Sequence, residues 1–187
     1  MSELSLFPGI YQDEIKTKVV NVASVPQRSP FRYPGGKTWL VPLFRRWIDS
    51  LDTTECLVEP FAGGGIISLT AVFENLIERA LMVEMDHEMA AAWQTIIGND
   101  REWLADKILN FDLTRESAVI ELATKRRSFK EIAFQTVLKN RTFHGGILAE
   151  GAGFIKDGEN GKGILSRWYP QTIARRIRNI GLVAHKI

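Results

Sequence analysis

The sequence has 187 residues, of which 45% are hydrophobic and 25% charged, a size and composition typical of one globular domain. It contains no run of about 18 apolar residues and no basic segment leading into an apolar stretch at the start, so we expect a cytoplasmic protein without a membrane span. The single cysteine, Cys56, excludes an internal disulfide and a cysteine-rich zinc site. Because Cys56 lies in an apolar run, we expect it to be a small core residue.

The net charge of +2 conceals an asymmetry along the chain. Residues 1–124 hold 11 Lys and Arg against 18 Asp and Glu, whereas residues 125–187 hold 13 against 4. A basic segment on an acidic body predicts a polyanionic partner on one face. A solvated basic surface is the alternative that charge alone leaves open.

The first half of the chain predicts a strand, loop and helix unit. Residues 1–28 are weakly patterned and indicate an arm with one short strand at 18–22, and apolar residues at helical spacing predict a helix over 37–51. The following segments are a short buried strand at 55–59, a glycine loop at 61–65, a helix at 66–79 and a second strand at 81–85. This β-loop-α-β order is typical of nucleotide-binding α/β sheets.

The second half is mainly helical. Residues 87 to about 140 have helical periodicity in segments at 87–98, 101–110 and 116–139, with a break at 125–127. Seven glycines within 144–163 predict a long loop. Pro170 opens a helix that reaches about residue 179, and 181–187 has the pattern of a further strand.

The glycine loop and the next strand contain the first candidate binding residues. Gly63, Gly64 and Gly65 follow a strand and open a helix, where glycines let a ligand approach free backbone N–H groups. Glu84 follows about 20 residues on, where a carboxylate can accept hydrogen bonds from a ribose diol. The third glycine of the dinucleotide fingerprint is replaced by Ser68, and a tight turn and an ordinary strand-end charge remain the alternative explanations.

A second glycine element imitates a phosphate-binding loop. Gly36, Lys37 and Thr38 match its end, but the motif requires glycine at position 31, which is Phe31. Prolines at 30 and 34 also do not suit a central strand. We therefore expect no phosphate-binding loop, and the element offers an aromatic and a cation beside a bend for a small polar ligand.

Three segments together resemble the Dam-type family of adenine-specific DNA methyltransferases. They are RYPGGK at 32–37, VEPFAGGG at 58–65 and MVEMD at 82–86, in that order and spacing. NRTFHGG at 140–146 and SRW at 166–168 are similar to later family segments. His144 departs from the family's usual asparagine, so the resemblance gives it no role.

The resemblance implies an α/β fold, an incomplete Rossmann-like S-adenosylmethionine-dependent methyltransferase fold with a helical DNA-recognition insert. It divides the chain into an N-terminal arm at 1–28, a partial cofactor-binding domain at 29–87 and 166–187, and an insert at 88–165. The implied partner is double-stranded DNA, with no membrane. The basic charge of the insert agrees with this, since Glu131 is the one acidic residue among its clustered cations.

The resemblance also implies the site residues for the cofactor S-adenosylmethionine and for DNA. The methionine end of the cofactor would lie against Tyr33, Gly35, Gly36 and Lys37, with Lys37 pairing with its carboxylate. Phe61, Gly63 and Gly65 would lie under the ligand, and Glu84 would hold the ribose hydroxyls. The DNA-binding candidates are Lys125, Arg126, Arg127, Lys130, Lys139 and Arg141, whose phosphate contacts would position DNA without reading its bases.

The family's Asp-Pro-Pro-Tyr motif, which holds the flipped adenine, is missing. The seven prolines lie at 8, 26, 30, 34, 42, 60 and 170, and no two are adjacent. We expect a truncated or split enzyme, inactive by itself, with a second chain or second copy covering the exposed edge of a three-stranded parallel sheet. A catalytically inactive module that binds S-adenosylmethionine or DNA is the alternative, and the missing third glycine disfavours a dinucleotide-dependent enzyme.

Overall fold

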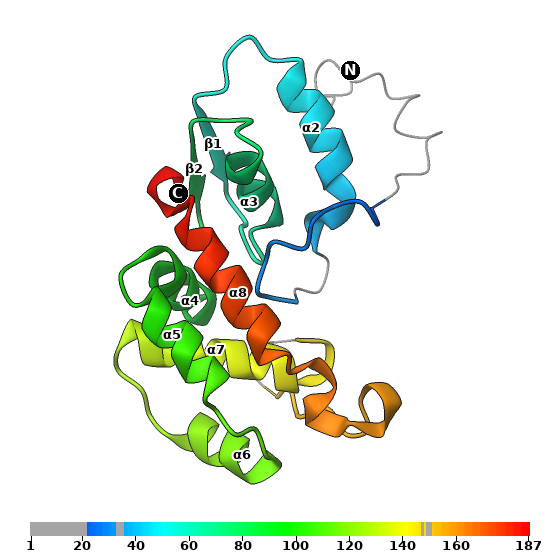
Figure 1. The fold of residues 1–187 in the computed structure, drawn as a ribbon, viewed down its shortest axis with the longest axis vertical. Coiled ribbons are helices and arrows are strands. Elements are labelled where there is room, and N and C mark those ends of the chain that lie inside the picture. Colours follow the sequence, from blue (N-terminus) through cyan, green and yellow to red (C-terminus); the bar gives the residue numbers. More distant parts are fainter. Residues whose placement is uncertain (1–21, 33–35, 147, 149–150) are drawn as a thin grey trace.

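The computed structural model describes residues 22–32, 36–146, 148 and 151–187 (Figure 1). Its α-helices are α2 (Val41–Asp49), α3 (Ile66–Phe73), α4 (His87–Ile97), α5 (Arg101–Leu109), α6 (Arg115–Ala123), α7 (Phe129–Thr142) and α8 (Pro170–Gly181). Its strands are β1 (Cys56–Glu59) and β2 (Arg79–Met82), and short 3₁₀ helices lie at Lys37–Leu40, His144–Gly146, Glu159–Gly161, Gly163–Arg167 and Ala184–Lys186. The short strand expected at 18–22 lies outside the described residues except for Val22, which is not part of a strand.

The strand, loop and helix unit is present, with shifted bounds. β1 and β2 pair in parallel, with Val58 opposite Leu81, and α3 connects them. Helix α3 begins after Gly65, whose φ of 64° is left-handed, and ends at Phe73 instead of continuing to 79. Asn75, with a φ of 54°, turns the chain away from helical geometry at that point.

One face of this sheet is uncovered among the described residues. Leu57 and Ala80 pack with α2 and α3 in one apolar cluster, but Val58 and Leu81 on the opposite face are 53% and 54% exposed. The strand expected at 55–59 is present as β1, but its expected burial is wrong. The core position expected for Cys56 is also wrong, because Cys56 is exposed. A parallel sheet is buried on both sides only when layers cover both faces, and here α2 and α3 cover one (Figure 1).

The helices after the sheet form a second body with its own core. Helix α4 packs on α7, and α5 packs on α8. Local signals fix their starts: Asp86 accepts the N–H groups of Glu88 and Met89 at the start of α4, and Thr114 and Ser128 form capping boxes for α6 and α7. The expected helices and the break near 125–127 are confirmed.

The end of the chain differs from the expected strand at 181–187. The N–H groups of Leu182 and Val183 donate to the carbonyls of Asn179 and Ile180, and a 3₁₀ helix at Ala184–Lys186 follows. These turns continue α8 and satisfy the backbone locally, so the segment adds no strand to the described sheet. In Figure 1 the C-terminus lies beside β2, while α6 lies at the other end of the molecule. None of the described helices has both the length and the apolar character that crossing a membrane requires.

Candidate functional site

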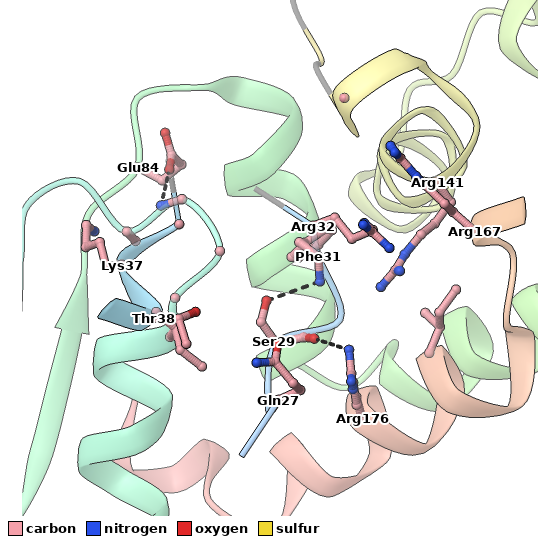
Figure 2. Close-up of a pocket in the computed structure, with 18 of the residues that line it drawn as sticks. Gln27, Ser29, Phe31, Arg32, Lys37, Thr38, Glu84, Arg141, Arg167 and Arg176 are labelled. Carbon is pink, nitrogen blue, oxygen red and sulfur yellow. Dashed lines mark hydrogen bonds between the residues drawn. The ribbon is translucent and has the colours of Figure 1, made fainter. Parts of the chain in front are cut away.

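A pocket of about 840 Å³ lies where the glycine loop, the segment at 27–32, α7 and α8 meet. Figure 2 shows Lys37 and Glu84 on one side and Arg32, Arg141, Arg167 and Arg176 on the other. Its described lining residues from the sheet unit and the segments before it are Gln27, Ser29, Phe31, Arg32, Gly36, Lys37, Thr38, Phe61, Ala62, Gly63, Gly64, Gly65, Ile66, Glu84 and Met85. The helical body adds Arg141, Gly145, Arg167, Tyr169, Thr172, Ile173 and Arg176.

Backbone and side-chain hydrogen bonds fix the shape of the glycine loop. The N–H of Gly63 donates to Glu84 Oε2 at 2.7 Å, and the Gly63 carbonyl accepts from the indole Nε1 of Trp93 at 2.8 Å. At Gly65 a Cβ would lie 2.7 Å from Cε of Met82 and 2.8 Å from the Trp93 ring. Glycine is thus required at position 65 both by the positive φ and by the close packing beneath the loop.

Lys37 is tied to the loop through a buried carboxylate. Its ammonium group forms an ion pair with Glu59 at 2.7 Å and also donates to the Phe61 carbonyl. Glu59, 5% exposed, further accepts the Ser68 N–H at 3.1 Å and the Ser68 hydroxyl at 2.6 Å. Ser68 therefore holds a carboxylate at the position where the dinucleotide fingerprint has its third glycine, a role that sequence reasoning missed.

The opposite end of the pocket is strongly basic. Arg141 of α7 donates to the Pro30 carbonyl, and Arg176 of α8 donates to the Ser29 carbonyl at 3.0 Å. Burial, together with the charges of Arg176, Arg32 and Arg167, lowers the pKa of Arg141 to about 10. Sequence reasoning missed Arg167 and Arg176; the run of basic residues at 175–178 was the available signal.

The structure brings together all the predicted cofactor residues that it describes. Gly36, Lys37, Phe61, Gly63, Gly65 and Glu84 line the same pocket. Tyr33 and Gly35 lie outside the described residues. The second oxygen of Glu84, Oε1, accepts the Asp86 N–H at 2.9 Å, so the carboxylate is held in place at the pocket wall. The role of these residues in binding a cofactor stays a prediction.

The predicted DNA-binding residues are not all free surface cations. Lys125 and Arg127 are exposed, but other members of the set have acidic partners, and Arg141 is buried at 4% exposure. These pairs are Arg126 with Glu121 and Glu131, Lys130 with Asp100, and Lys139 with Glu88. The expectation that Glu131 alone opposes the cluster is therefore wrong, because helix packing brings acids from α4, α6 and the start of α5. Their role in binding DNA stays a prediction.

The site and its setting define the class of protein. A strand, a glycine loop and a helix, followed by a carboxylate after the next parallel strand, is an arrangement that recurs in nucleotide-binding α/β folds. The chain belongs to the family of D12 class N6 adenine-specific DNA methyltransferases, whose model matches residues 33–142. The family resemblance is thereby confirmed. No curated protein matches the chain.

Proposed function

We propose that the chain binds S-adenosylmethionine in the pocket and DNA across its basic helical part, for methylation of the adenine amino group. The observation that carries the proposal is the link between Gly63 and Glu84, which places a bare backbone and a fixed carboxylate side by side in one pocket. When bound, S-adenosylmethionine supplies a methyl group on a sulfonium that is ready for transfer.

The residues fit this cofactor. Glu84 uses its oxygens to accept two backbone N–H groups, and each oxygen retains a lone pair for a ribose hydroxyl. Glycines at 63 to 65 leave the loop without side chains where a ligand would approach. The Lys37 ammonium group already pairs with Glu59. If it also bound the carboxylate of the cofactor, it would donate hydrogen bonds to two carboxylates at once.

Calorimetric titration with S-adenosylmethionine tests the cofactor site. Glu84→Ala removes two acceptors, each worth roughly 1.5–3 kcal/mol with a charged group, and is expected to weaken binding by about a hundredfold or more. Gly63→Val is expected to abolish it. Glu78→Ala, an exposed carboxylate that is not among the residues lining the pocket, serves as the control. No binding by the unmodified chain would refute the cofactor assignment.

We further propose that methyl transfer needs groups beyond these 187 residues. No two prolines are adjacent, so the chain has no Asp-Pro-Pro-Tyr motif to hold a flipped adenine. A methyl-transfer assay on unmethylated DNA, with the chain alone and mixed with a polypeptide that carries the motif, tests this. Activity of the chain alone contradicts the proposal, and cofactor binding without activity in either mixture favours the alternative, an inactive binding module.

We expect a second chain or second copy to cover the edge of the sheet, and the uncovered face is consistent with the same partner also packing a layer on it, as both faces are covered in a Rossmann-like fold. Val58 and Leu81 lie side by side in the register, and Val83 beyond them is 41% exposed. Apolar side chains in such a row are stabilised when another layer covers them. Light scattering on the purified chain tests whether a second copy does so: a dimer supports this, and a stable monomer excludes a second copy as the covering layer.

A further inference from the structure

The end of the pocket opposite the glycine loop has chemistry that the cofactor site does not use. Four arginines line it. They are Arg32 in the segment at 27–32, Arg141 in α7, Arg167 at the end of the 3₁₀ helix at Gly163–Arg167, and Arg176 in α8. Among the described residues that line the pocket, Glu84 is the one carboxylate, and it lies on the other side (Figure 2). The two ends therefore differ in charge.

Arg141 and Arg176 are not neutralised within the described part of the chain. Each donates to a backbone carbonyl, of Pro30 and Ser29 respectively, and neither pairs with a carboxylate there. The Nε of Arg141 is buried and has no hydrogen-bond partner among the described residues. The positive charges of Arg141 and Arg176 repel each other. An anion bound between them would offset that repulsion.

An exposed aromatic side chain adjoins this basic end. Tyr169, two residues after Arg167, lines the pocket and is 50% exposed. Guanidinium groups beside an accessible aromatic ring are typical of surfaces that hold a nucleic-acid strand, through phosphate contacts and base stacking. A single small carboxylate needs only one guanidinium, so the arrangement favours a strand with several phosphates.

We propose that this arginine end of the pocket binds the phosphate backbone of the DNA strand whose adenine is presented for methylation. The inference rests on the function proposed above. It assigns Arg141, Arg167 and Arg176 to DNA binding. Arg167 and Arg176 lie outside the stretch at 125–141 in which the sequence predicts the DNA-binding residues. The cofactor and the substrate strand would then enter one pocket from opposite ends.

Arg176→Gln tests this by fluorescence anisotropy with a labelled oligodeoxynucleotide, single-stranded and as a duplex, over a range of salt. Each lost phosphate contact lowers the slope of log K against log salt by about 1. We expect that loss in Arg176→Gln and an unchanged slope in Arg176→Lys. Arg175→Gln is the matched control, because Arg175 is the exposed neighbour on α8 and does not line the pocket. Circular dichroism melting of each variant checks that it is folded.

The outcomes separate this inference from the proposed function. An Arg176→Gln slope equal to that of the unmodified chain overturns it. So does weaker S-adenosylmethionine binding with an unchanged DNA slope, which would give the arginines to the cofactor's carboxylate. An unmodified chain that binds the cofactor but no DNA overturns both the inference and the DNA-binding part of the proposed function. One that binds neither overturns the cofactor assignment as well, whereas DNA binding with a normal slope in Arg176→Gln overturns the inference alone.

Discussion

Asn140 holds the backbone of Arg32 at both of its polar groups. Its Oδ1 accepts the Arg32 N–H at 2.9 Å, and its Nδ2 donates to the Arg32 carbonyl at 2.8 Å. The same Nδ2 also donates to the Gly146 carbonyl at 3.2 Å. The Asn140 side chain, which is fully buried, thus joins α7 to the segment that ends at Arg32 and to Gly146, at one wall of the pocket.

Asn140→Ala is expected to lower the free energy of unfolding by about 1–3 kcal/mol, because it leaves buried backbone groups without partners. Urea denaturation measures this. Cofactor affinity should fall as well, since Arg32 leads directly into the element at 33–37. Asn179→Ala, at an exposed position on α8, should change stability little, and equal losses in the two variants would contradict the bridging role of Asn140.

Gly146→Ala tests the same wall from the other side. Gly146 has a φ of 72°, and a Cβ there would lie 2.8 Å from the Arg32 carbonyl oxygen. Gly161 has a φ of 69° with nothing within 4 Å of such a Cβ. Both alanines bear the left-handed backbone cost of about 1–2 kcal/mol, but only Gly146→Ala adds a clash with backbone. Thermal denaturation should therefore show a larger loss of melting temperature for Gly146→Ala than for Gly161→Ala. Similar losses would mean that the backbone around Arg32 shifts to make room for the added Cβ at little cost.

Local sequence signals predicted much of this fold, and the long-range contacts escaped them. Asp86, Thr114 and Ser128 mark helix starts within a few residues, so α4, α6 and α7 were predictable. The pairing of Asn140 with Arg32 joins residues 108 apart, and that of Arg176 with Ser29 joins residues 147 apart. Nothing in the local pattern indicates which distant backbone a polar side chain will contact.

The exposure of the strands could not be predicted from the sequence for the same reason. An apolar stretch around Cys56 predicts a strand, but whether a layer covers each face depends on where distant helices pack. Here the helices after the sheet pack with one another, and one face of the sheet stays exposed among the described residues. The glycine loop and its contact with Glu84 were predictable because the glycines, the strand before them and Glu84 lie within one short unit. The arginine end was not, since its members come from four separate segments.

Glu74 ties the first described segment to α2 and gives the fold a pH dependence. Arg45 donates to it through Nε at 2.8 Å and Nη2 at 2.7 Å, and Arg28 adds a third bond at 3.1 Å. The hydrogen bond from Arg45, reinforced by Arg28 and opposed by burial, lowers the pKa of Glu74 below its ordinary value of 4.5. Its stabilisation is therefore complete above that value and is lost as the pH falls through the folded-state pKa.

Glu74→Gln should accordingly reduce stability by about 1 kcal/mol at neutral pH. The difference from the unmodified chain should shrink as the pH falls below the carboxyl's ordinary pKa. Urea denaturation at a series of pH values measures it, with Glu78→Gln as the exposed control. A difference that stays constant down to acidic pH would show that the loss has another cause than the charge of Glu74.

The basic turn at 125–127 contains one cation with a structural role, Arg126, and two exposed cations that are candidates for DNA binding. Arg126 donates to the Glu121 carboxylate through Nε at 3.2 Å and Nη2 at 2.8 Å, and Glu121 is 8% exposed. Arg126→Ala leaves that acid without its cation and should cost about 1–3 kcal/mol of stability. Lys125 and Arg127 are exposed, so replacing both by alanine should change stability by less than about 0.5 kcal/mol.

If this turn contacts phosphates, Lys125→Ala with Arg127→Ala should weaken DNA binding equally for unrelated sequences and lower the salt slope by about 2. S-adenosylmethionine binding should not change, because neither residue lines the pocket. Arg79→Ala removes an exposed cation from the start of β2 and serves as the control for net charge. The double variant removes two charges and the control one, so a loss of binding free energy in the control that is half that of the double variant would mean that overall charge, and not this turn, determines binding. An unchanged slope in the double variant would place the DNA on another face of the helical body.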